Sequence, residues 1–319
     1  MKKTLVYAFL ALMFCCLAIV PPAASAANGK IAFESYDNGH VKIFEMNPDG
    51  TGVTRITDNT SNDYHPAWSP DGTKIAYSSD RDGDQEIWIM NADGSGQTRL
   101  TNIPDKNDEP AWSPDGKKIA FVSGHDNNRE IWVIHTDGSG PVRLTSNSYP
   151  DISPAWSPDG TKIAFFSSRG LSEAIYTMNT DGTGQTPLTN GQLYSAYEPA
   201  WSPDGKKIAF ESGTRTGDVI TVMNTNGTGL IQFLNNSGMD YSPAWSPDGK
   251  KIAFFSNQVA APSYISVMNA DGSDPARITR NISAQYPSWG PLTNTLPEVP
   301  AVIVILCVFI VLLFAQRRK

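Results

Sequence analysis

Acidic residues and tyrosines recur at fixed distances before six tryptophans, and their side chains are suited to binding. They stand three, four and five residues ahead of each tryptophan. Carboxylates attract cations and basic groups, and tyrosine anchors interfaces because its ring buries area while its hydroxyl forms a hydrogen bond. The candidate partner-binding residues are Asp63, Tyr64, His65, Asp108, Glu109, Asp151, Tyr197, Glu198, Asp240, Tyr241 and Tyr286. We predict that they form one binding rim. The alternative is a set of solvated loops in which the aspartates cap turns.

Catalytic residues are not assigned. Nucleophilic catalysis needs a serine or cysteine beside a histidine and an acid. Between the two apolar ends the chain has no cysteine, only four histidines, and no Gly-x-Ser-x-Gly segment. The serine of the repeated Ser-Pro-Asp-Gly phrase is expected to be a turn residue. We therefore predict a protein that is not an enzyme and has no cofactor.

The segment Asp80–Glu86 resembles the first half of a calcium loop. The closing glutamate of such a loop would stand at position 91, which is Asn91. The segment is therefore either a plain hairpin loop or a weak calcium site. Zinc lacks ligands at metal spacing, so no metal ligand is assigned.

Four Asn-x-Ser/Thr sequons are candidate glycosylation sites if the chain is exported. They begin at Asn59, Asn226, Asn235 and Asn281. All four fall in expected turns or loops.

These residues belong to a unit that is repeated along the chain. The phrase Pro-Ala-Trp-Ser-Pro-Asp-Gly occurs five times, with a shorter sixth copy at Pro287–Gly290. The six tryptophans stand at positions 68, 112, 156, 201, 245 and 289, so the period is 44 or 45 residues. A period of this length is typical of β-propeller blades.

Each unit predicts four short strands. Pro-Ala-Trp-Ser forms the first strand, and Ser-Pro-Asp-Gly forms a tight turn because proline sets φ and glycine accepts positive φ. Lys74–Tyr77 predicts the second strand of its unit, Ile87–Met90 the third and Thr98–Thr101 the fourth. The third strand is apolar at consecutive positions, as expected when both faces of a sheet are covered.

The ends of the array predict how the ring closes. The first unit begins at Lys30 with its second strand, and the last tryptophan segment, Pro287–Gly290, has no second strand after it. We therefore predict an all-β fold, a six-bladed β-propeller of four-stranded antiparallel blades. The C-terminal first strand completes the N-terminal blade and removes two exposed sheet edges. A linear solenoid is the alternative, and it would leave that strand unpaired.

The two ends of the chain read as targeting segments. Residues 1–26 have a basic start, an apolar run and an Ala-x-Ala end, which predicts a signal peptide. Residues 27–292 form the propeller and residues 293–298 a linker. Residues 299–315 are apolar and are followed by the basic residues 316–319, which predicts a C-terminal membrane anchor with a cytoplasmic tail.

The C-terminal tail also resembles the sorting signals of archaeal surface proteins, which have a Pro-Glu-Phe-type motif, an apolar helix and an arginine-rich end. Pro297-Glu298-Val299-Pro300 and Arg317-Arg318-Lys319 match in type, although Val299 stands in place of the aromatic residue. The resemblance implies that the apolar segment is removed and replaced by a lipid.

The charge of the chain disfavours nucleic acid as a partner. The formal net charge is −7. Removing the five basic residues of the two ends from the 25 in the chain leaves 20 against 32 acidic residues, so the exported body carries −12. Such a surface repels acidic polymers and attracts cations or basic partners.

The repeats resemble those of TolB-family β-propellers, which are related in shape to WD repeats. The likeness rests on the Trp-Ser-Pro-Asp-Gly-Lys/Thr-Lys-Ile-Ala-Phe stretches and the Met-Asn-x-Asp-Gly turns, and it covers about residues 29–290. The resemblance implies a propeller used as a binding platform. The N-terminal domain of TolB proteins is expected to be missing, because two or three residues separate Ala26 from the first strand.

Taken together, these patterns predict an exported propeller tethered at the cell surface that binds a protein partner. The first alternative is a propeller that binds or cleaves glycans with the same acids and tyrosines. The second alternative is a purely structural protein of the cell envelope.

Overall fold

The computed structural model describes one compact unit of the chain. It covers residues 29–292 apart from 126–127, 171–172, 190, 192, 216, 234–237 and 258–261. The expected signal peptide, linker, membrane anchor and basic tail lie outside the described residues. Within the described part of the chain, no helix is long and apolar enough to cross a membrane.

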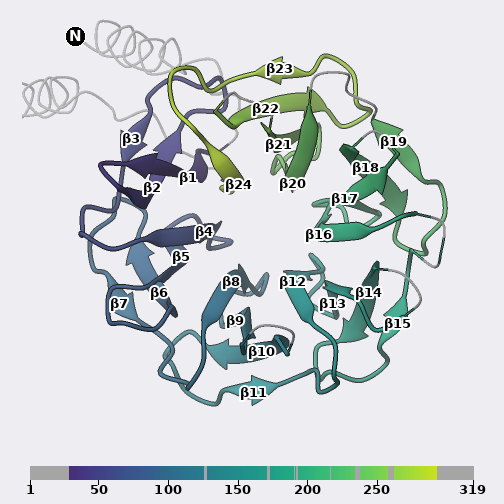
Figure 1. Cartoon of the computed structure of the whole chain (residues 1–319), viewed down its shortest axis with the longest axis horizontal. Coiled ribbons are helices and arrows are strands. Elements are labelled where there is room, and N and C mark those ends of the chain that lie inside the picture. Colours follow the sequence, from purple (N-terminus) through teal and green to yellow (C-terminus); the bar gives the residue numbers. More distant parts are fainter. Residues whose placement is uncertain are drawn as a thin grey trace, which may run out of the picture. The chain divides into compact units, whose positions relative to one another are not determined.

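The described residues form six four-stranded antiparallel sheets arranged as a ring (Figure 1). In chain order, blade I is β24-β1-β2-β3, blade II is β4–β7, and blades III to VI follow in the same way. The first strand of each sheet lies nearest the axis, and the fourth lies on the outside (Figure 1). The predicted six-bladed propeller is therefore confirmed.

The strand bounds repeat from blade to blade. The inner strands are β4 (Asp63–Trp68), β8 (Asn107–Trp112), β12 (Asp151–Trp156), β16 (Ala196–Trp201), β20 (Met239–Trp245) and β24 (Gln285–Trp289). The second strands are β1 (Ile31–Asp37), β5 (Lys74–Ser79), β9 (Lys118–Ser123), β13 (Lys162–Ser167), β17 (Lys207–Thr214) and β21 (Lys251–Asn257). The third strands are β2 (His40–Met46), β6 (Glu86–Asn91), β10 (Glu130–His135), β14 (Ala174–Asn179), β18 (Gly217–Asn224) and β22 (Tyr264–Asn269). The outer strands are β3 (Thr54–Arg55), β7 (Thr98–Arg99), β11 (Val142–Arg143), β15 (Thr186–Pro187), β19 (Ile231–Phe233) and β23 (Ala276–Arg277).

The Ser-Pro-Asp-Gly phrase makes the turn between the first two strands of a blade. In blade II the Ser69 hydroxyl donates to Asp71 at 2.6 Å, and the Gly72 amide donates to the Ser69 carbonyl at 2.9 Å. Gly72 has φ of 69°, which glycine adopts without steric cost. The same bonds recur in blades III to VI, so the repeated phrase determines this turn locally.

The hydrophobic core lies between neighbouring blades. Between blades II and III, for example, Ile87 and Ile89 of β6 pack in one cluster with Phe121 of β9. The middle strands are covered on both faces, as the consecutive apolar residues predicted. Each blade therefore depends on its neighbours for burial.

A ladder of tryptophan hydrogen bonds also joins neighbouring blades. The indole nitrogen of Trp112 donates to the Ala67 carbonyl of the preceding blade at 3.0 Å. The bonds Trp156–Ala111, Trp201–Ala155 and Trp245–Ala200 are equivalent. Among the described residues, the buried indole nitrogens of Trp68 and Trp289 have no such partner. The ladder is thus interrupted on both sides of blade I.

Strand β24 closes the ring, as predicted. It pairs antiparallel with β1, with Trp289 opposite Ile31 and Ser288 opposite Ala32. The two strands come from opposite ends of the repeat array, so the first and last units share one sheet.

The inner strands begin earlier than the sequence predicted. Positions three to five before each tryptophan were expected in the connection between blades. In blades II to VI they lie within the inner strand, as in Asp63–Trp68. The strand register shifts there, for example between Tyr64 and Ala67. This bulge adds a residue without ending the strand, and it turns that part of the strand towards the axis.

Candidate functional site

Six residues at one repeat position adopt a left-handed backbone conformation. They are His65 (φ 48°), Glu109 (54°), Ser153 (54°), Glu198 (50°), Ser242 (49°) and Tyr286 (49°). Each stands three residues before the repeat tryptophan and directly before a proline. Residues before proline normally stay extended, and a non-glycine residue at positive φ costs about 1–3 kcal/mol. The ring of strands must hold this conformation in place.

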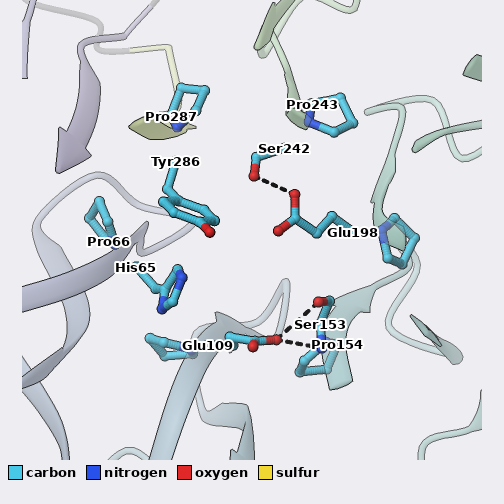
Figure 2. A pocket seen from close by; sticks show the side chains of 12 residues that line it. His65, Pro66, Glu109, Ser153, Pro154, Glu198, Ser242, Pro243, Tyr286 and Pro287 are labelled. Atoms are coloured by element: carbon cyan, nitrogen blue, oxygen red, sulfur yellow. Dashed lines mark hydrogen bonds between the residues drawn. The ribbon is translucent and has the colours of Figure 1, made fainter. Parts of the chain in front are cut away.

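These six residues and the prolines after them line a pocket on the axis of the ring (Figure 2). The pocket has a volume of about 200 Å³. Its wall carries one imidazole, two carboxyl groups and three hydroxyl groups. It opens on the face where the inner strands begin and the hairpins between the second and third strands lie. We call this the pocket face.

His65 is held by acids of two neighbouring blades. Its Nδ1 atom lies 2.7 Å from Oδ1 of Asp108, and its backbone amide donates to Glu34 at 3.1 Å. Burial by itself lowers the pKa of His65, but the charges of Asp108, Glu34 and Glu109 outweigh it and raise the pKa to about 10. His65 is therefore a fixed positive charge at neutral pH.

The two glutamates of the wall are bound to the serines that follow them round the ring (Figure 2). Glu109 accepts hydrogen bonds from the Ser153 amide at 2.6 Å and hydroxyl at 3.0 Å. Glu198 accepts one from the Ser242 hydroxyl. Each carboxylate thus stays at the wall, with room to accept further donors from the pocket.

The pocket disfavours additional negative charge. Burial raises the pKa of Glu198, although its bond to Ser242 acts in the opposite direction. Burial and the surrounding carboxylates also raise the pKa of Tyr286, so its hydroxyl stays protonated and can donate or accept. These shifts are those expected where several acids share a buried site.

The prolines separate two cavities on the axis. On the side away from the pocket face, a second cavity of about 550 Å³ is lined by repeat prolines and tryptophans, including Trp68, Trp201, Trp245 and Trp289. Ionisable side chains line the pocket and not the second cavity, so charged ligands are expected on the pocket face.

The predicted rim residues fall into three groups, of which one lines the pocket. The lining members are His65, Glu109, Glu198 and Tyr286. The second group, Tyr64, Asp108, Tyr197 and Tyr241, lies beside the pocket between blades. Tyr197 stacks on Phe166 with ring centres 4.7 Å apart, and Tyr241 stacks on Phe255 at 5.1 Å. These tyrosines contribute to blade packing as well as to the pocket face.

The third group is buried inside the blades. Asp63, Asp151 and Asp240 are 0%, 0% and 2% exposed. Asp63 lies 3.3 Å from the ammonium of buried Lys42 and 3.1 Å from Arg81, and Asp151 pairs with Arg169. These aspartates hold elements of the ring together, because a buried charge needs a partner of opposite sign.

Several residues of the site did not stand out in the sequence. Ser153 and Ser242 complete the ring of six. The acids Glu34 and Glu211 lie next to this ring, since Glu34 accepts the His65 amide and Glu211 stands opposite Tyr197, the residue before Glu198. The sequence did distinguish these two acids from the equivalent residues of other blades. Both follow Ile-Ala-Phe, at a position that is Val122, Phe166 or Phe255 in other blades.

The segment Asp80–Glu86 forms a hairpin whose acids bind protein groups. Asp80 accepts hydrogen bonds from Asn62 at 2.8 Å, and Glu86 binds Arg99 and Asn107. Among the described residues, no three or more histidines, cysteines or acids are grouped so that they could hold a metal ion. The arrangement agrees with the plain hairpin.

The sequons differ in how they are held. The Asn59 amide is engaged on both sides, since it accepts from Lys42 at 2.7 Å and donates to Asp63 at 2.7 Å. Asn226 and Asn281 are exposed. Asn235 lies outside the described residues. Of the three described sequons, Asn59 is therefore the least suited to carry a glycan in the folded chain.

The fold and the axial pocket define a six-bladed β-propeller with a polar site at one mouth of its axis. Comparison with protein families matches residues 16–109 and 97–293 to the TolB beta propeller domain. The chain belongs to this family, and the resemblance of its repeats is confirmed. The comparison with curated proteins found no match.

Solved structures agree on the fold. TolB from Acinetobacter baumannii is 23% identical, with a TM-score of 0.75 over 88% of this chain and 70% of that chain. A TolB-type protein from Agrobacterium tumefaciens is 21% identical, with a TM-score of 0.68 over 83% and 93% of the two chains. Hydrazine synthase of Kuenenia stuttgartiensis is 15% identical, with a TM-score of 0.71 over 83% of this chain and 47% of that chain.

Proposed function

We propose that the chain is a non-enzymatic interaction module that binds a protein partner on its pocket face. The proposal includes export and tethering at the cell surface, which the composition of the two chain ends supports. A propeller fold is suited to such a role, because its loops gather around one mouth on a rigid ring.

One observation carries the proposal. Exposed tyrosines lie on the pocket face, one near the end of β1 and two in connections between blades. Tyr36, Tyr149 and Tyr194 are 66%, 49% and 66% exposed. Tyrosine is enriched at protein interfaces and is a frequent hot spot. The opposite face exposes aliphatic residues at or just before the start of three outer strands, Val53, Val142 and Ile231.

The two faces provide a matched experiment. The purified propeller is used to capture partners from surface extracts, alongside a variant with Tyr36→Ser, Tyr149→Ser and Tyr194→Ser. The control variant carries Val53→Ser, Val142→Ser and Ile231→Ser. We expect a partner that is retained by the parent protein and the control and lost by the tyrosine variant. Capture of no partner, or equal capture by all three proteins, would refute the proposal.

A glycan ligand is the second candidate, because the pocket wall combines carboxyl and hydroxyl groups with Tyr286. A carbohydrate array, probed with and without calcium, distinguishes it from a protein partner. Strong signals that disappear in the tyrosine variant would favour the glycan ligand. An array without signals, together with a captured protein, supports the interaction module.

A further inference from the structure

Two buried glutamates occupy the same repeat position in different blades. Glu34 lies on β1 of blade I, and Glu211 lies on β17 of blade V. They are 6% and 7% exposed. The other four blades have Ser78, Val122, Phe166 or Phe255 there. A carboxyl group at this depth needs hydrogen bonds and a positive charge to remain ionised.

Glu34 has both of these. It accepts the His65 amide at 3.1 Å. Burial raises the pKa of Glu34, and the positive imidazole of His65, in the next blade, acts in the opposite direction. The imidazole itself is fixed by Asp108. Blade II therefore supplies the counter-charge for the buried acid of blade I.

Glu211 has no residue that corresponds to His65 beside it. The residue of blade VI that corresponds to His65 is Ser242, and its hydroxyl is bound to Glu198. Among the described residues, no hydrogen bond or ion pair reaches the carboxyl group of Glu211. Burial raises its pKa to about 9, and the charges of Glu198 and Asp218 act in the same direction. Glu211 is thus nine-tenths buried, has no partner, and lies close to two further acids.

Glu198 links this buried acid to the pocket. Its side chain lines the pocket on the side of Ser242, and Glu109 lies in the wall of the same pocket (Figure 2). A cation that enters would contact Glu198 directly and would favour ionisation of Glu211, which lies next to it. His65 also lines the pocket, but its charge is already paired with Asp108.

We propose that the axial pocket binds the ammonium group of a lysine side chain at its Glu198–Ser242 side, where the lysine supplies the positive charge that His65 supplies to Glu34. The proposal rests on the proposed function, because it names the group that the protein partner presents. A lysine ammonium has three donors, which suit Glu198 and the hydroxyls of Ser242 and Tyr286. Its narrow alkyl chain fits a pocket of about 200 Å³ walled by prolines.

The test uses the full chain and a minimal probe, Nα-acetyl-lysine methylamide, titrated while NMR spectra are recorded. The matched neutral probe is the norleucine analogue, which has the same alkyl chain without the ammonium group. We expect saturable binding of the lysine probe and none of the neutral one. Glu198→Gln should weaken binding by about tenfold or more, because it removes the carboxylate that accepts the ammonium group. Glu211→Gln should do so as well, because the carboxyl group of Glu211, whose pKa is about 9, ionises beside a bound ammonium group and glutamine cannot.

A further variant tests the comparison between Glu34, which has His65 beside it, and Glu211, which has Ser242 in that place. Ser242→His places at blade VI the residue that serves Glu34 at blade II, so it should abolish binding of the lysine probe. Asp58→Asn, which removes an exposed acid from a connection on the pocket face, is the control and should bind like the parent chain. Thermal unfolding of each variant confirms that it is folded. Glu211→Gln replaces a buried carboxyl group without a partner and is not expected to unfold the chain.

The outcomes separate this proposal from the interaction module. Equal binding of both probes, or unchanged affinity in Glu198→Gln and Glu211→Gln, overturns the lysine site. If a protein partner is still captured in a tyrosine-dependent way, the proposed function survives that result. If the lysine probe binds as expected while extracts yield no partner, the lysine site stands and the proposed function fails.

Discussion

The Nδ1 atom of His65 lies 2.7 Å from the Oδ1 atom of Asp108, which joins blade II to blade III at the wall of the axial pocket. This pair is the only one of its kind among the six equivalent positions described, since the other five carry glutamate, serine or tyrosine. It places a paired imidazolium on one side of the pocket, whereas Glu198, on the opposite side, has no cationic partner among the described residues. The predictions below follow from this asymmetry and from the way the ring is closed.

The protonation of His65 should persist well above neutral pH. Burial lowers its pKa, but the neighbouring acids raise it to about 10, against about 6.5 in an unfolded chain. Its contribution to stability is therefore complete below pH 6.5 and is lost as the pH rises through about 10. NMR of the imidazole nitrogens should show His65 protonated at pH 8. Asp108→Asn should lower this pKa, and titration of His65 near pH 6.5 in the parent chain would contradict the prediction.

Replacing Glu211 should stabilise the protein. Its pKa of about 9 in the folded chain, against about 4.3 when unfolded, means that folding takes up a proton between these values. Stability therefore falls as the pH rises through that range. Glu211→Gln should raise the free energy of unfolding by about 1–3 kcal/mol at pH 8, and by less at pH 5. Urea unfolding measures this difference, with Asp58→Asn as the control. A loss of stability at pH 8 would show that Glu211 has a partner.

The tryptophan ladder should contribute measurably to stability. Trp112→Phe removes a 3.0 Å hydrogen bond and leaves the Ala67 carbonyl without it, whereas Trp68→Phe removes an indole nitrogen that has no partner. The change in ring size is the same in both variants. We expect Trp112→Phe to cost about 1 kcal/mol more than Trp68→Phe in urea unfolding. Equal costs would mean that the bond contributes nothing net.

Closure by β24 should be essential for folding. A chain that ends at Leu292 keeps the pairing of Trp289 with Ile31, and we expect it to fold as a monomer. A chain that ends at Ala284 lacks β24, so β1 becomes an exposed edge and blade I loses its inner strand. Circular dichroism and size-exclusion chromatography should show that this shorter chain is unfolded or aggregated. A folded monomer from it would refute closure as the basis of stability.

Much of the fold could be predicted from the sequence, because each blade is encoded locally. The period of 44 or 45 residues, the Ser-Pro-Asp-Gly turns and the apolar third strands depend on residues that are near one another in the chain. Closure could also be predicted, since the first unit lacks the strand that the last unit has in excess. Export, the anchor and glycan occupancy remain predictions from composition.

The axial site was decided by tertiary structure. Sequence spacing identified His65, Glu109, Glu198 and Tyr286 but grouped them with Asp63, Asp151 and Asp240, which are buried within the blades. The reason is the bulge before each proline. It places one residue per blade in a left-handed conformation that residues before proline rarely adopt, so local rules could not predict it. The contrast between Glu34, which has His65 as a partner, and Glu211, which has none among the described residues, likewise exists only in the ring, because the partner comes from the neighbouring blade.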